Sequence, residues 1–268
     1  MSTDRQSSLV KITELENGIF KIILSDPSHQ NTLSEKMIDE LQSAFDHFNS
    51  SPSRVIILSS TGKVFSAGHD LKELKAARSH PDKGKEYFQS ILKKCSRLMQ
   101  TIVNHSKPVI AQVDGVATAA GCQLALSCDL VYASSNSRFA TPGVNIGLFC
   151  STPMVALSRN TTSKHSMEML LTGELISADE AEKKGLINKS VDEEELENLI
   201  LEKATKISSK SGTTLKIGKK AFYQQIEMPL DEAYEYASKV MLENMLDQDA
   251  KEGIEAFIAK RKPNWQDK

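Results

Sequence analysis

The sequence predicts an α/β protein in which a layered core precedes a helical region. Over the first half of the chain, short apolar runs typical of buried strands alternate with longer stretches of helical periodicity. After Pro153 the pattern becomes mostly helical, and no low-complexity linker separates the two parts. We therefore expect a core over residues 1–200 and a C-terminal helical region over residues 201–268.

The first expected elements are a β-hairpin and a helix. Strand patterns over Leu9–Leu15 and Ile19–Leu24 flank the Asn-Gly dipeptide at 17–18, which is typical of a tight turn. Thr32 and Glu35 then have the spacing of a capping box, and apolar residues recur behind them at helical intervals. The sequence thus predicts a helix whose N-terminus is capped by Thr32.

The remaining elements continue the alternation and then become helical. Ser177 and Glu180 have capping-box spacing, and Gly185 is expected to end the helix that they begin. Buried strands are expected over Val55–Leu58, Val109–Val113 and Leu130–Ala133. Helical faces are expected over residues 87–102, Leu196–Ile207, Leu215–Phe222, Ala233–Leu246 and Ile254–Ile258.

Composition and charge exclude several classes of partner. Hydrophobic residues make up 40% of the chain and charged residues 25%, as in soluble globular proteins. The formal net charge of −2 favours neither nucleic acid nor an anionic membrane as a partner. No apolar stretch is long enough to span a bilayer. The first residues lack a signal-peptide core and carry acids early, so we expect a cytoplasmic protein, with the mitochondrial matrix as the alternative for a processed form.

Motifs for metal, nucleotide and nucleophilic chemistry are incomplete. The six histidines show neither H-E-x-x-H nor Cys/His ligand spacing, so we expect no metal. Residues 61–63, Thr-Gly-Lys, lack the earlier Gly and the following Ser or Thr of a phosphate loop. A G-x-S-x-G nucleophile motif is absent from the sequence. The four cysteines lack C-x-x-C spacing, and we expect them to be buried free thiols.

Two loops remain as candidates for a site, and each follows an apolar strand and opens into a helix. They read V-F-S-A-G-H-D-L-K-E-L over 64–74 and A-A-G-C-Q-L over 119–124. Backbone N–H groups at a helix start are unpaired, and two of them aimed at one carbonyl oxygen would form an oxyanion hole. Small residues would let that oxygen approach. The same pattern also fits two tight connections in which Gly and Ala serve packing, and the residues alone leave both interpretations open.

Five stretches, in order and at the right spacing, resemble the enoyl-CoA hydratase/isomerase (crotonase) family. They read F-S-A-G-H-D-L-K-E-L, D-G-V-A-T-A-A-G-C-Q-L-A-L-S-C-D-L, R-F-A-T-P-G-V-N-I-G-L, T-G-E-L-I-S-A-D-E-A and A-F-I-A-K-R-K. The resemblance implies a spiral of ββα units with C-terminal helices that build a homotrimer or a dimer of trimers. It also implies binding of acyl-CoA thioesters in fatty-acid or acyl-CoA metabolism, with coenzyme A entering as part of the substrate and no separate cofactor.

The resemblance also implies site residues, carried over position by position. The two N–H donors of the oxyanion hole fall on His69 and Ala120, and the His69 side chain is expected to point away. The family usually has Gly at position 120, and fewer backbone conformations are open to Ala. Residues matched to the CoA moiety are Ala67, Asp70, Leu71, Lys72 and, from a neighbouring subunit's tail, Phe257 and Lys260. The alternative for that tail is a helix without a role in CoA binding, in which Phe257 packs in the core and Lys260 is solvated.

The chain departs from the family at both catalytic carboxylates. The positions of the two Glu side chains that activate water and protonate the α-carbon hold Gln123 and Gly143. General acid–base groups contribute about 10²–10⁴-fold each, so we expect slow hydration. Gly143 is expected to leave room for a bound anion. Residues near the lost groups that could replace them are Thr141, Asn145, Cys150, Asp70 and His69.

Two functions remain open at this point. The favoured one is an enoyl-CoA hydratase/isomerase-like enzyme, a lyase, isomerase or hydrolase, that uses the oxyanion hole and an unidentified base. The other is an acyl-CoA-binding protein or partner subunit that retained the site and lost the chemistry. Both predict binding of a CoA thioester, so turnover of a panel of thioesters is what separates them.

Overall fold

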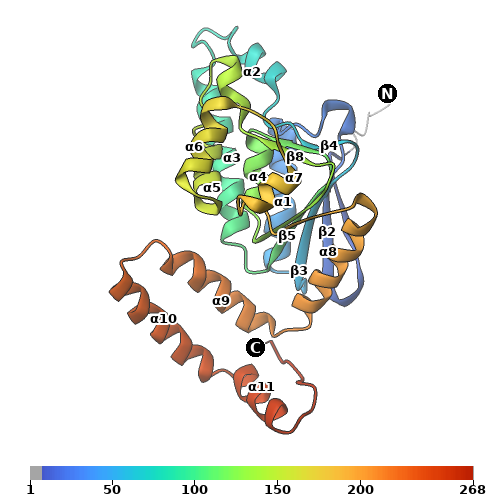
Figure 1. Cartoon of the computed structure of the whole chain (residues 1–268), viewed down its shortest axis with the longest axis vertical. Helices are drawn as coiled ribbons and strands as arrows, with labels where there is room; N and C mark the ends of the chain where they lie inside the picture. The colour runs from blue at the N-terminus through green and yellow to red at the C-terminus, as the bar shows by residue number, and fades with distance from the viewer. Residues whose placement is uncertain (1–7, 268) are drawn as a thin grey trace, which may run out of the picture.

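The computed structural model describes residues 8–267, and its core is built on two sheets (Figure 1). The larger sheet has the order β1-β2-β3-β5-β7-β10 and is parallel except for β1, which pairs antiparallel with β2. Its strands are β1 (Val10–Glu14), β2 (Ile19–Leu24), β3 (Val55–Ser60), β5 (Val109–Val113), β7 (Leu130–Ser134) and β10 (Lys189–Val191). The smaller sheet contains β4 (Val64–Ser66), β6 (Val116–Thr118), β8 (Arg138–Ala140) and β9 (Ile176–Ser177).

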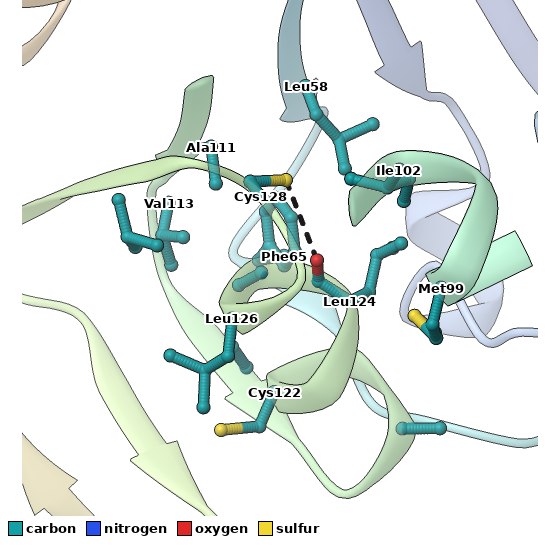
Figure 2. Packing of buried hydrophobic residues seen from close by; sticks show 14 of the residues in the cluster. Leu58, Phe65, Met99, Ile102, Ala111, Val113, Cys122, Leu124, Leu126 and Cys128 are labelled. Atoms are coloured by element: carbon teal, nitrogen blue, oxygen red, sulfur yellow. Dashed lines mark hydrogen bonds between the residues drawn. The ribbon is translucent and has the colours of Figure 1, made fainter. Parts of the chain in front are cut away.

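Helices cover both faces of the larger sheet, which confirms the predicted α/β layering. On one face, α8 (Glu193–Ser208) packs Leu196 and Ile200 against buried residues of the strands. On the other face lie α1 (Glu35–Asn49), α3 (Lys85–Val103) and α4 (Ala120–Leu126). Figure 2 shows Leu124 of α4 beside Met99 and Ile102 of α3, in the same cluster as Leu58 of β3. The apolar flank of α4 is therefore fixed in the core.

Three further helices form an arm that projects from the core (Figure 1). They are α9 (Gly212–Gln225), α10 (Leu230–Met245) and α11 (Gln248–Ile258). Many of their apolar side chains face solvent in the single chain, which is unusual for a monomer surface. Those that are at least 54% exposed are Phe222, Ile226, Leu230, Tyr234, Met241, Leu242, Met245, Leu246, Ile254, Phe257 and Ile258.

Short helices complete the core, and the helix starts test the sequence predictions. These helices are α2 (Leu71–Ala77), α5 (Pro153–Asn160), α6 (Ser163–Thr172) and α7 (Ala178–Lys183). The capping box at Ser177 and Glu180 is confirmed, since both of its hydrogen bonds are present. The predicted cap at Thr32 is wrong: α1 begins at Glu35, and the Ser34 hydroxyl accepts the Met37 N–H at 3.2 Å.

Candidate active site

The first loop leaves β4 and enters α2 through Gly68, whose φ of +87° is a conformation that side chains rarely adopt. Asp70 caps α2, because its Oδ1 accepts the Lys72 N–H at 2.7 Å. Two backbone bonds hold the loop against the segment before α1: Leu33 N to Gly68 O at 2.8 Å and Ala67 N to Gln30 O at 3.1 Å. The loop is thus positioned by main-chain hydrogen bonds at Ala67 and Gly68.

The second loop leaves β6 and enters α4 through a strained residue. Ala119 has φ 49° and ψ −122°, and such a conformation in a non-glycine residue costs on the order of 1–3 kcal/mol. Its N–H donates to the Ala140 carbonyl at 3.0 Å, which anchors the turn. Ala120 is the first helical residue, outside the positive-φ region, so Ala in place of the family's Gly carries no such strain at that position.

The two loops meet at Gly68 and Gly121. A Cβ on Gly68 would lie 3.1 Å from the Ala120 nitrogen, and one on Gly121 would lie 2.1 Å from the Ser66 carbonyl oxygen. Glycine is therefore required at both positions for the loops to approach. Between residues 8 and 267 the N–H groups of His69 and Ala120 find no acceptor. Two free N–H donors therefore lie on adjoining loops, and an oxyanion hole is built from groups of this kind.

Two buried side-chain oxygens on α4 and after β8 also lack partners. Gln123 is 5% exposed and shares a face of α4 with Ala120 by its i, i+3 spacing, and no described residue hydrogen-bonds to its Oε1. Thr141 is 1% exposed, follows the Ala140 carbonyl that anchors the second loop, and has an equally unpartnered Oγ1. An unsatisfied buried oxygen costs about 1–3 kcal/mol, so both oxygens are free to accept a hydrogen bond.

The position of the second family carboxylate is closed. A Cβ on Gly143 would lie 2.5 Å from the Leu148 carbonyl oxygen and 2.9 Å from Cys150 Sγ. The segment folds back on itself, since Leu148 N–H donates to Gly143 O at 2.9 Å and Gly143 N–H lies 3.3 Å from Cys150 Sγ. The expectation that Gly143 leaves room for an anion is therefore wrong, because a main-chain carbonyl fills that space.

The residues expected to contact CoA divide into two groups. A cavity of about 360 Å³ brings four of them, on the first loop and the start of α2, together with His69 and with a segment that sequence reasoning missed. Its lining is Ala67, His69, Asp70, Leu71, Lys72 and the earlier Ser28, His29, Gln30 and Thr32. The Asp26-Pro27 dipeptide, which ends the preceding strand pattern, was the available signal for that segment. A larger hollow of about 710 Å³ between β1 and α1 contains none of the expected residues.

The other group lies elsewhere in the single chain. Phe257 lies in the last turn of α11 and Lys260 follows the helix, and Figure 1 places α11 and α2 at opposite ends of the long axis of the molecule. Phe257 is 85% exposed, so the alternative in which it packs in the core is wrong for the single chain. Within one chain, Phe257 and Lys260 therefore lie far from the cavity beside the first loop.

Titratable groups near the loops are held in their neutral forms. The His69 ring places Nδ1 3.3 Å from the Leu33 carbonyl, and burial lowers its pKa. Burial also raises the pKa of the Cys150 thiol, and it raises that of Cys122 to about 12. All four cysteines are buried and free, as predicted. No group of three or more potential metal ligands occurs among residues 8–267.

Comparison with known proteins decides the family. A sequence model described as "Enoyl-CoA hydratase/isomerase" matches residues 14–268. The chain belongs to this family. The Mus musculus protein named "Enoyl-CoA hydratase domain-containing protein 3, mitochondrial" is 50% identical over 254 residues, which cover 94% of this chain and 83% of that protein.

Solved structures of family members have the same fold. Human enoyl Coenzyme A hydratase domain-containing protein 3 superposes with a TM-score of 0.91 at 48% identity, covering 96% of this chain and 100% of that one. An enoyl-CoA hydratase from Mycobacterium smegmatis gives a TM-score of 0.92 at 43% identity, covering 97% and 99% of the two chains. These likenesses confirm the predicted crotonase-type α/β fold. The chain also carries the motifs H-D-L-K-E-L and P-G-V-N-I-G-L-F-C-S-T-P, which agree with its similarity to enoyl-CoA hydratase domain-containing protein 3.

Proposed function

We propose that this member of the enoyl-CoA hydratase/isomerase family binds acyl- or enoyl-CoA thioesters and stabilises a thioester enolate. The observation that carries the proposal is the pair of free N–H groups of His69 and Ala120 on adjoining loops. An enolate oxygen held there gains both hydrogen bonds without reorganisation of the loops, and one such donor is worth about 2.7–4 kcal/mol in other enzymes.

The CoA moiety would occupy the cavity beside the first loop. Lys72 brings a cation to its rim, which suits a CoA phosphate, while Ala67 and Leu71 offer apolar surface along the path to the hole. Coenzyme A enters as part of the substrate, and the proposal requires no separate cofactor. The reactions that follow belong to fatty-acid or acyl-CoA metabolism.

The two substituted positions argue against efficient hydration. Gln123 has no proton to exchange near neutral pH, and Gly143 is covered by the Leu148 carbonyl. Addition of water needs a group that activates it, and neither of these positions supplies one. The proposal therefore favours enolate chemistry that consumes no water. The same closure supports the second candidate, a catalytically silent acyl-CoA-binding protein or partner subunit.

A homotrimer or a dimer of trimers would complete the site. The apolar side chains exposed along α9, α10 and α11 form a surface that a second copy could bury. Phe257 and Lys260 would then reach the CoA cavity of a neighbour, with the aromatic ring near the adenine and the cation near a phosphate.

For its location, we propose the mitochondrial matrix. The mouse relative described above carries "mitochondrial" in its name, and neither the structure nor the comparisons supports the cytoplasmic prediction. No helix in residues 8–267 is long and apolar enough to cross a membrane. Fractionation of cells that produce the tagged protein would test this assignment.

Calorimetry and turnover assays test the proposed function. Titration with acetyl-, crotonyl- and palmitoyl-CoA should give saturable heat at micromolar to millimolar ligand, and free pantetheine should bind more weakly. Absence of binding to all three thioesters at millimolar concentration would overturn the central claim. Turnover of the same thioesters, followed by absorbance and mass spectrometry, separates the enzyme from the silent binding protein.

A further inference from the structure

The rings of His105, which is buried, and of His69, which is partly buried, differ in how their nitrogens are satisfied. In His105 both nitrogens are paired: Nε2 lies 3.1 Å from the Phe45 carbonyl, and Nδ1 accepts the Lys107 N–H at 3.1 Å. In His69 only Nδ1 has a partner, the Leu33 carbonyl at 3.3 Å. His69 Nε2 is buried and contacts no hydrogen-bonding group among residues 8–267. A buried polar atom without a partner requires an explanation.

The Leu33 bond fixes which nitrogen of His69 carries the proton. A carbonyl oxygen only accepts, so Nδ1 donates to it, and Nε2 of the neutral ring presents a lone pair. Burial lowers the pKa of His69, and Glu73 on α2 is the charged group that acts in the opposite direction. The ring is therefore neutral near pH 7 and holds an unused basic nitrogen.

His69 also belongs to the loop that carries the first of the two free donors. Its backbone N–H is that donor, so its side chain branches from the residue that would bind the thioester oxygen. Its side chain also lines the cavity beside the first loop. The side chains at the family's carboxylate positions supply no base, because Gln123 is an amide and Gly143 has no side chain.

We propose that His69 is the proton-transfer residue of this site, an inference that rests on the proposed binding of CoA thioesters. Nε2 takes the proton from Cα of the acyl group, and the C–H electron pair becomes the double bond between Cα and the thioester carbon. The carbonyl π pair moves to oxygen, where the His69 and Ala120 N–H groups bind it. The imidazolium then returns the proton to Cα or, when the acyl group is unsaturated, to Cγ, which shifts the double bond without consuming water.

Exchange of the α-protons with solvent deuterium tests this step directly. The full-length protein is incubated with butyryl-CoA in D₂O, and deuterium at Cα is followed by mass spectrometry. His69→Ala and His69→Gln both keep the backbone N–H, and both should lower the exchange rate by about 10²–10⁴-fold. The dissociation constant for butyryl-CoA should stay within about threefold, because the hole donors remain. Added imidazole should restore part of the exchange in His69→Ala, which a purely structural role would not allow.

His105→Ala is the matched control, because it removes a buried neutral imidazole that lies away from the loops. It should lower stability and leave exchange per folded molecule unchanged. Binding of butyryl-CoA without exchange by the wild type would overturn the role of His69 and leave the proposed binding of CoA thioesters intact. Full exchange in either His69 variant would overturn it as well, and so would parallel loss of binding and exchange in both variants. Failure of the wild type to bind any CoA thioester would instead overturn the proposed function.

Discussion

The Leu148 carbonyl oxygen occupies the space beside Gly143, 2.5 Å from where a Cβ at that position would lie. The family's second catalytic carboxylate is therefore replaced by main chain and not by an empty pocket. Restoring a Glu at this position would require the segment between Gly143 and Cys150 to move, because backbone cannot yield as the end of a flexible side chain does. Of the two family carboxylates, the one at position 143 therefore cannot be restored by substitution of that residue alone.

Gly143→Ala should already destabilise the protein. The added methyl overpacks against Leu148 O and Cys150 Sγ, and overpacking typically costs about 1–3 kcal/mol. The free energy of unfolding from urea titration measures the effect. Gly218→Ala is the control, since a Cβ there meets nothing within 4 Å and Ala is favoured over Gly in a helix by roughly 1 kcal/mol. An unchanged stability for Gly143→Ala would show that the 143–150 segment relaxes freely.

Gln123→Glu should place a carboxyl group in a buried position with no partner for it. Burial raises the pKa of such a group, so the variant should lose stability as pH rises above the unfolded value of about 4.3 and should approach the wild type below it. Urea midpoints at about pH 4 and about pH 7.5 measure this dependence. Hydration of crotonyl-CoA should rise by less than the ~10²–10⁴-fold of a complete acid–base group, because the Gly143 position still supplies no base. A pH-independent loss of stability would contradict the burial argument.

Acid should destabilise the wild-type protein through His105, which is buried, and His69, which is partly buried. Burial lowers the pKa of both His69 and His105 in the folded state, so the unfolded chain binds more protons than the folded one below about pH 6.5. Their contribution is complete above that value and is lost as pH falls through the folded pKa. The urea midpoint should therefore fall between about pH 7.5 and about pH 5.5. The fall should shrink in His69→Gln, and an equal fall in this variant would exclude His69 as a contributor.

Lys219 fastens the C-terminal arm to the core, and Lys219→Met should loosen it. Its Nζ lies 2.7 Å from Asp129 Oδ2 and also donates to two backbone carbonyls, while Tyr223 OH binds the other Asp129 oxygen at 3.0 Å. The Lys219 side chain is only 8% exposed, and removing one partner of a buried pair costs about 3–5 kcal/mol. Limited proteolysis should cut near Lys210 faster than in the wild type. Lys220→Met, at an exposed neighbouring position, is the control.

Periodicity predicted the long elements because their burial is one-sided or complete along several residues. Val109–Val113 was located to the residue for this reason. The strands that carry the site, β4, β6 and β8, have three residues each, which is too short for any period to appear. The donors at His69 and Ala120 came from motif resemblance. The strain at Ala119 and the closure of Gly143 by Leu148 depend on tertiary contacts that no local pattern encodes.

The last prediction concerns the residues that the single chain leaves far from the cavity. If α11 of one copy reaches the CoA cavity of another, the double variant Phe257→Ala, Lys260→Ala should bind CoA thioesters roughly tenfold more weakly, because a charge-assisted contact is worth about 1.5–3 kcal/mol. Its oligomeric state by light scattering should be that of the wild type. Lys251→Ala is the control, since that side chain is 76% exposed on the same helix and makes only a surface ion pair.

A dilution series separates supply in trans from a contact within one chain. Phe257 and Lys260 lie away from the cavity of their own chain, so affinity for acetyl-CoA should fall when the wild type is diluted below the concentration at which it dissociates. In the double variant affinity should be independent of protein concentration, because it has already lost the contact. Light scattering that shows a wild-type monomer at micromolar concentration, with full affinity, would contradict the trans arrangement. Unaltered affinity of the double variant in an intact oligomer would exclude these two residues from the CoA site.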